Sequence, residues 1–219
     1  MYIFETIFDS LYLIAVVILG VITWCRAHDR LEFRIFGIAA ILLGCGDAFH
    51  LIPRIISMNT AGGFDANVAA LGAGQLVTSI TMTVFYLLLY AALRARYNIK
   101  GERALTGTMI GLAVIRIVLC LMPQNAWVSA NAPLSWGIYR NIPFAIMGVL
   151  MIVLFFKHAR AANDVDFKFM WLAIALSFGF YIPVVLFAGT FPPIGALMLP
   201  KTLAYVWIVL MGFRAARKA

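Results

Sequence analysis

Three side chains that can move protons or bind anions follow one another at helical spacing in the first quarter of the chain. Asp47, His50 and Arg54 are separated by three and four residues, so a helix places them on one face. A carboxylate beside an imidazole can act in acid–base chemistry, and a guanidinium can bind an anion. Gly46 lets a ligand or a second helix come close. The pattern predicts Asp47 and His50 as catalytic residues; a structural ion pair of Asp47 is the alternative.

The elements that position these residues are predicted to be membrane-spanning helices. Of the 219 residues, 64% are hydrophobic and 12% charged, whereas soluble domains carry about 25% charged residues. A helix needs roughly 20 apolar residues to cross a bilayer. Seven stretches qualify, at about 3–25, 33–54, 67–93, 104–122, 134–156, 167–189 and 193–213. The sequence therefore predicts an all-α fold, with residues 1–219 forming a single seven-helix transmembrane domain of the cell membrane.

Basic residues predict the orientation of this bundle. Thirteen of the seventeen Lys and Arg residues fall in the segments after the first, third, fifth and seventh stretches. The segments PQNAWVSANAP and GTFPP on the other side contain none. Because positive loops stay in the cytoplasm, we expect the N-terminus outside and the C-terminus inside. This distribution also accounts for the net charge of +8 without nucleic acid as a partner.

The remaining charges lie within or near the predicted spans. The four bases are Arg54, Arg116, Arg140 and Lys201, and the four acids outside cytoplasmic loops are Glu5, Asp9, Asp47 and Asp65. Charges in hydrocarbon are costly and usually pair inside the bundle. The equal numbers predict mutual neutralisation without identifying the pairs.

Each predicted helix also places one polar side chain at a similar depth in the outer half of the membrane, given a rise of about 1.5 Å per residue. These residues are Asp9, Asp47, Gln75, Arg116, Asn141, Tyr181 and Lys201. We therefore predict a hydrated, charged cavity open to the outside; unrelated structural hydrogen bonds are the alternative. The candidate substrate-binding residues are Arg54, Gln75, Ser79, Arg116, Asn141, Tyr181 and Lys201.

Two further patterns concern metals and helix packing. Only His50 of the three histidines lies within a predicted span, and a zinc site needs three or four ligands, so we expect no metal and no cofactor. Gly107 and Gly111 form a GxxxG pattern, which predicts close packing of that helix on a neighbour.

The segment GDAFHLIPR, residues 46–54, resembles the signature of the YhhN-type lysoplasmalogenase family, and the following LGAGQLVTSITMTVFYLLLY is similar in placement to that family's next helix. The resemblance covers about residues 40–95. It implies a polytopic membrane enzyme that hydrolyses the vinyl ether of lysoplasmalogens, with Asp47 as its key carboxylate and Gly46, Pro53 and Arg54 beside it. Membrane lipids and a lysophospholipid or small polar ligand are the implied partners.

Two other functions remain open. A transporter or channel for a small anion or protons would also use a charged layer within the membrane. Seven helices with Lys201 in the last one also resemble a rhodopsin, in which that lysine would carry retinal as a Schiff base. Pro53 is expected to end or kink the second helix in any of these functions.

Overall fold

Seven long α-helices make up most of the computed structural model, which describes residues 2–218. They are α1 (Tyr2–Cys25), α2 (Leu31–Asn59), α3 (Val68–Arg96), α4 (Arg103–Leu121), α5 (Leu134–Ala161), α6 (Met170–Phe187) and α7 (Met198–Lys218). Three short 3-10 helices, η1 (Asp65–Asn67), η2 (Pro123–Asn125) and η3 (Pro192–Leu197), lie in the connections. All seven α-helices are long and apolar enough to cross a membrane. The predicted all-α class and seven spans are confirmed, and the chain is a multi-pass membrane protein.

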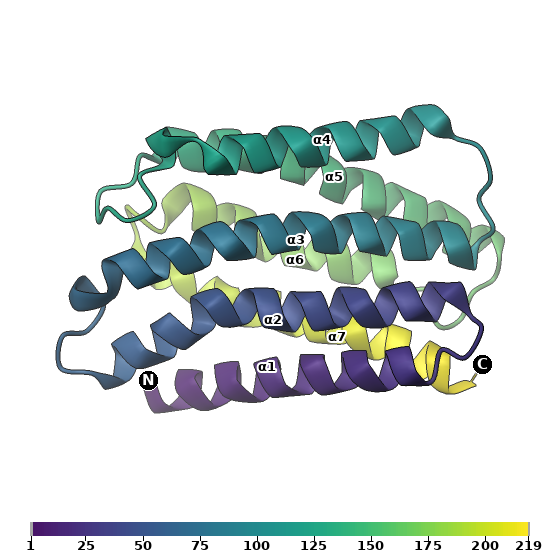
Figure 1. The fold of residues 1–219 in the computed structure, drawn as a ribbon, viewed down its shortest axis with the longest axis horizontal. Coiled ribbons are helices and arrows are strands. Elements are labelled where there is room, and N and C mark those ends of the chain that lie inside the picture. The colour runs from purple at the N-terminus through teal and green to yellow at the C-terminus, as the bar shows by residue number, and fades with distance from the viewer. Residues whose placement is uncertain (1, 219) are drawn as a thin grey trace.

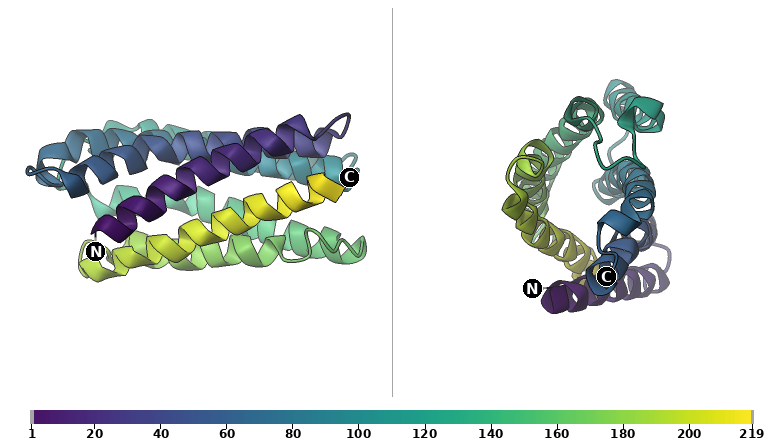
Figure 2. Two further views of the ribbon diagram at one scale, coloured as in Figure 1. Left: turned by 90° about the horizontal axis from the view of Figure 1, so that it is seen from below. Right: turned by 90° about the vertical axis from the view of Figure 1, so that its left-hand side faces the viewer.

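The helices run up and down in sequence order and form a closed ring (Figures 1 and 2). Each helix packs against the next one along the chain, and α1 packs against α7 as well. Viewed along the bundle, α2, α3 and α4 form one row and α5, α6 and α7 the other, with α1 at the side where the rows meet (Figure 2). The termini lie at opposite ends, here called the N end and the C end (Figure 1). The prediction that the N end faces outward rests on the loop charges.

An aromatic cluster fills the middle of the bundle. Tyr86 of α3 meets Phe144 of α5 and Phe178 of α6 edge-on, with ring centroids 5.0 and 5.7 Å away. Phe85 of α3 meets Tyr205 of α7 in the same way at 5.9 Å. Such pairs contribute about 0.5–1.5 kcal/mol each beyond the burial of their surface. The cluster therefore holds four helices together across the two rows.

The second helix does not end at Pro53, because α2 continues to Asn59. Proline lacks an amide hydrogen, so the carbonyl of Phe49, four residues earlier, loses its helical partner. Gly74 of α3 packs directly against that Phe49 carbonyl, where a Cβ atom would collide with it. Beyond the proline, the Ser57 hydroxyl donates to the Pro53 carbonyl at 2.7 Å. The proline thus opens a place for α3 to approach without stopping the helix.

The GxxxG prediction for α4 is wrong. A Cβ atom built on Gly107 or Gly111 would meet no other atom within 4 Å. The helix packs on α3 and α5 through its other side, where Met109 and Ala113 are buried. The close helix approaches in this bundle lie instead at glycines of α2 and α3, such as Gly46 and Gly74.

A charged cluster ties α3 to the α5–α6 connection at the C end. The carboxylate of Asp164 accepts hydrogen bonds from Arg96 Nε at 2.5 Å, Arg96 Nη2 at 2.9 Å and the Tyr97 hydroxyl at 2.9 Å. Burial works against the ionised form of Asp164, but the hydrogen bonds and charge of Arg96 outweigh it and hold the pKa below its usual range. Burial first, and then the charge of Asp164, raises the pKa of Tyr97.

We expect Gly74→Ala to lower the thermal stability of the protein in detergent. The added methyl group would press on the backbone of α2, which cannot move away without shifting a helix, so about 1–3 kcal/mol should be lost. Gly107→Ala is the control, since it makes the same change in open space and should leave the melting temperature unchanged or higher. Equal melting temperatures for the two variants would contradict the close approach of α2 and α3.

We expect Asp164→Asn to destabilise the protein at neutral pH. Because the native carboxylate has a lowered pKa, its contribution is present above the usual value of 3.8 and is lost as the pH falls through the native pKa. The free energy of unfolding, measured between pH 7 and pH 3, should therefore be higher for wild type than for the variant, and this difference should become smaller only below about pH 4. Asp29→Asn, at an exposed ion pair with Arg34, should have little effect. A gap that does not change with pH would argue against this account.

Candidate functional site

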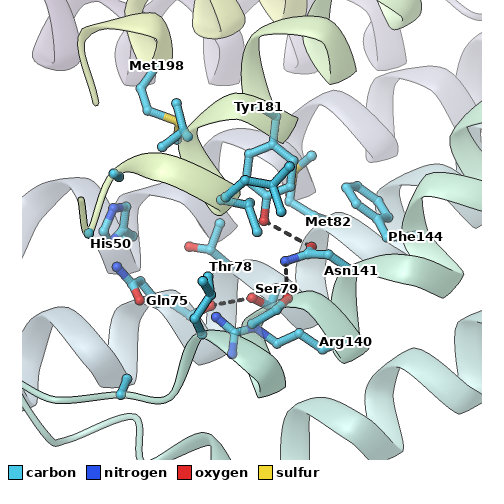
Figure 3. A pocket seen from close by; sticks show the side chains of 18 of the residues that line it. His50, Gln75, Thr78, Ser79, Met82, Arg140, Asn141, Phe144, Tyr181 and Met198 are labelled. Atoms are coloured by element: carbon cyan, nitrogen blue, oxygen red, sulfur yellow. Dashed lines mark hydrogen bonds between the residues drawn. The ribbon is translucent and has the colours of Figure 1, made fainter. Parts of the chain in front are cut away.

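A cavity of about 410 Å³ lies within the bundle toward the N end. Helices α2 to α7 all contribute to its wall, and the α4–α5 and α6–α7 connections cover it through residues such as Trp127 and Thr190. Figure 3 shows its side chains from close by. Its polar lining consists of His50, Gln75, Thr78, Ser79, Arg116, Arg140, Asn141, Tyr181, Thr190 and Lys201.

Seven of the nine predicted site residues line this single cavity: His50, Gln75, Ser79, Arg116, Asn141, Tyr181 and Lys201. The structure therefore brings together side chains from α2, α3, α4, α5, α6 and α7, five of which were grouped by their predicted depth. In Figure 3, His50 and Gln75 lie on one side of the space, and Asn141 and Tyr181 lie on the other. Their role in binding or catalysis stays a prediction.

The other two predicted residues lie outside the cavity wall. Asp47 accepts a hydrogen bond from the Tyr12 hydroxyl at 2.6 Å and is close enough to Lys201 for the two charges to interact. Arg54 pairs with Glu5 of α1, through Nε at 2.8 Å, and lies over the Phe64 ring. Asp47 thus stands behind the cavity, whereas Arg54 forms a separate ion pair nearer the N end.

The expected mutual neutralisation of the intramembrane charges is wrong for most of them. Within residues 2–218, Arg54–Glu5 is the one ion pair formed by the eight charges in question. No carboxylate lines the cavity among the residues that the structure describes, while three cations do, namely Arg116, Arg140 and Lys201. Among the described residues, the cavity wall therefore carries positive side chains only, with Asp47 behind it close enough to interact with Lys201.

Aromatic rings take the place of acids beside these cations. The guanidinium of Arg116 lies 3.3 Å from the Phe144 ring centroid, and that of Arg140 lies 4.2 Å from the Trp127 ring. Lys201 Nζ lies 4.9 Å from the Tyr181 ring. Cation–π contacts contribute about 2 kcal/mol when desolvated, and they do not occupy the N–H donors of the cation. Arg140 uses one of its donors elsewhere, because its Nη1 donates to Asn125 Oδ1 at 2.8 Å.

Arg116 has the least compensated charge of the three. Only 2% of its surface is exposed, and its Nε and Nη1 atoms are buried without a hydrogen-bond partner among the described residues. An unpaired buried charge is destabilising by several kcal/mol. An anion that accepted hydrogen bonds from these donors would relieve the penalty, because the fork of N–H groups in arginine matches phosphate and carboxylate oxygens.

An apolar groove of about 150 Å³ lies beside the cavity, between α5 and α6. The two spaces share five lining residues: Asn141, Phe144, Tyr181, Val185 and Leu186. At this junction the Tyr181 hydroxyl donates to Asn141 Oδ1 at 3.0 Å (Figure 3). Ile142 and Ile182, also in the groove, are 50% and 43% exposed on the outside of the bundle. The groove therefore connects the lipid-facing surface with the cationic cavity.

Several lining residues were not among the predicted site residues. Arg140 was visible in the sequence as an intramembrane cation directly before Asn141, and that signal was sufficient to include it. Thr78, which donates to the Gly46 carbonyl at 2.9 Å, lies one residue before Ser79 and gave no distinct signal. Phe144 and Trp127 act through their rings, which a search for polar residues passes over.

The cavity shows no cluster suited to a metal: in the part of the chain that the structure describes, no three His, Cys, Asp or Glu side chains lie close enough to hold one. No protein-family model matches the chain, and no match was found among curated proteins or solved structures. The resemblance of residues 46–54 therefore stays an expectation, and the case for function rests on the geometry of the cavity.

We expect Arg116→Met to raise the stability of the ligand-free protein in detergent. The change removes a buried unpaired charge and keeps an unbranched apolar stem, a replacement that stabilises by about 1–4 kcal/mol in comparable sites. Arg103→Met, at the exposed start of α4, is the matched control and should have little effect. A lower melting temperature for Arg116→Met would mean that the native protein already compensates this charge.

Proposed function

We propose that the protein binds an anionic lipid with one hydrocarbon chain and hydrolyses it within the membrane. The observation that carries the proposal is a cavity with three cations and no lining carboxylate among the described residues, joined to an apolar groove that reaches the bilayer. The lipid phosphate would lie against Arg116, Arg140 and Lys201. The hydrocarbon chain would leave through the groove between α5 and α6.

The dimensions and chemistry of both spaces support this ligand class. Ligand pockets usually measure about 300–1,000 Å³, and the cavity with its groove falls within that range. Arginine pairs with phosphate through two parallel hydrogen bonds, and Arg116 has two buried donors without partners within the described part of the chain. A chain lying against Ile142 and Ile182 would remain in contact with the surrounding lipid tails, so it needs no closed tunnel.

The reaction that we propose is hydrolysis of a vinyl ether, the bond that the resemblance of residues 46–54 implies. His50 is the proton donor in this scheme because it reaches the cavity and its Nδ1 has no partner among the described residues. The imidazolium form of His50 gives a proton to the β-carbon, water adds to the α-carbon of the resulting oxocarbenium ion, and the proton from that water returns to the neutral imidazole. The hemiacetal then collapses to a fatty aldehyde and a glycerophosphodiester.

Asp47 acts indirectly in this scheme. It lies one helical turn before His50 on α2, behind the cavity wall, and is held by Tyr12. Its charge interacts with Lys201, so it would help to hold the ammonium group in its place at the cavity wall. We therefore assign Asp47 to positioning, and His50 to proton transfer.

The test uses purified protein in mixed micelles with a 1-alkenyl lysophospholipid, and with its 1-acyl analogue as the non-cleavable comparison. Wild type should bind both lipids and release fatty aldehyde from the alkenyl lipid alone. His50→Gln should bind the lipid but lose at least 100-fold in aldehyde release, the usual contribution of a general acid. Arg116→Gln should raise KM about tenfold or more, because a charge-assisted hydrogen bond contributes about 1.5–3 kcal/mol.

Arg54→Gln is the matched control, since it removes an intramembrane guanidinium outside the cavity and should change neither binding nor aldehyde release. If the protein binds the lipid but releases no aldehyde, the proposed ligand stands and the proposed reaction is wrong. Absence of lipid binding would overturn both. Flux of a small anion across vesicles containing the protein, without lipid binding, would instead support a transporter.

A further inference from the structure

A second polar pocket, of about 510 Å³, lies at the C end where α5 ends and α6 begins. It shares no lining residue with the cavity at the N end. Its charged residues are Arg160, Asp164 and Lys168, and its aromatic walls are Phe156, Phe169 and Trp171. The proposed function leaves this pocket without a role.

The two cations of the pocket have no acidic partner among residues 2–218. Within residues 2–218, neither Arg160 nor Lys168 takes part in an ion pair. Asp164 lies in the same pocket, but both of its carboxylate oxygens already accept hydrogen bonds from Arg96. The pocket therefore presents two positive side chains, and Asp164, the one acid among its described lining residues, already binds Arg96 and Tyr97.

Aromatic side chains lie against both cations at the C end of the bundle. The Arg160 guanidinium lies 5.7 Å from the Phe156 ring centroid, and Lys168 Nζ lies 5.3 Å from the Phe169 ring. Phe156 in turn meets Trp171 edge-on at 5.4 Å. Phe156 and Phe169 are 44% and 45% exposed, so the pocket continues into an apolar surface on the outside of the bundle. Aromatic residues of this kind gather where lipid headgroups meet the hydrocarbon.

We propose that this pocket binds the phosphate of an anionic glycerophospholipid from the leaflet at the C end. Basic pockets between transmembrane helices bind such headgroups, and the charge complementarity here is direct. The acyl chains would run along the exposed apolar side chains of α5, such as Val149 and Val153. The positive-inside orientation would make this the cytoplasmic leaflet, whose lipids are the more anionic. The pocket is independent of the proposed hydrolase site.

The experiment is native mass spectrometry of the intact protein with phosphatidylglycerol and phosphatidylcholine at equal concentrations. Wild type should retain several times more phosphatidylglycerol. The double variant Arg160→Gln/Lys168→Gln should lose this preference by about tenfold. Arg214→Gln/Arg217→Gln, with the same change of charge at the same end, should keep it, as should Arg116→Gln in the cavity.

Three results would overturn the proposal: no preference in wild type, the same loss in both double variants, or inorganic phosphate that displaces phosphatidylglycerol at equal concentration. The first result would mean that no such lipid site exists. The second would mean that the preference comes from general surface charge, and the third that the pocket binds a soluble anion. Melting temperatures in phosphatidylcholine alone show whether each variant is folded. A raised KM for lipid hydrolysis in Arg116→Gln with unchanged phosphatidylglycerol retention would separate this site from the cavity.

Discussion

The contact of cationic side chains with aromatic rings, inside a bundle surrounded by hydrocarbon, is the interaction on which the candidate site depends. Arg116 lies on Phe144, and Phe144 belongs to the aromatic cluster that joins α3, α5 and α6. The guanidinium is thus held by the same side chains that hold the bundle together. Because a ring stabilises a cation without occupying its N–H groups, the donors remain available to a ligand. An acid in the same place would have stabilised the helix bundle and removed the binding site.

The approach of α2 to α3 connects this site to the backbone. Pro53 frees the Phe49 carbonyl, and Gly74 fits against it. His50 follows Phe49 and Gln75 follows Gly74 in the chain, and both line the same cavity. Helix α1 contributes differently: Tyr12 binds Asp47 behind the wall, and Glu5 binds Arg54 near the N end. These contacts place Asp47 and Glu5 on the α1 side, while Arg116, Arg140 and Lys201 line the cavity.

The two ends of the bundle differ in how their charges are used. At the C end, Arg96, Tyr97 and Asp164 form a closed set of hydrogen bonds between α3 and the α5–α6 connection. Because Asp164 binds Arg96 and Tyr97, it is not free to pair with Arg160 or Lys168 in the adjacent pocket. The stabilising contact therefore leaves a positive pocket beside it. At the N end, the positive space lies within the bundle and opens into a groove between α5 and α6. We propose lipid phosphate as the ligand in both places, which have no lining residue in common.

The sequence by itself determined the seven spans and the depth of each polar side chain, because hydropathy and distance along a helix are counted directly from the chain. Seven of the nine predicted site residues accordingly share one cavity. Rotation of each helix about its axis is set by packing, so only the tertiary structure decided that Arg54 meets Glu5 and that Gly107 faces open space. The same holds for the rings beside Arg116, Arg140 and Lys201 and for the groove between α5 and α6. Which helix face meets which neighbour depends on side chains far apart in the chain, and no local pattern contains that information.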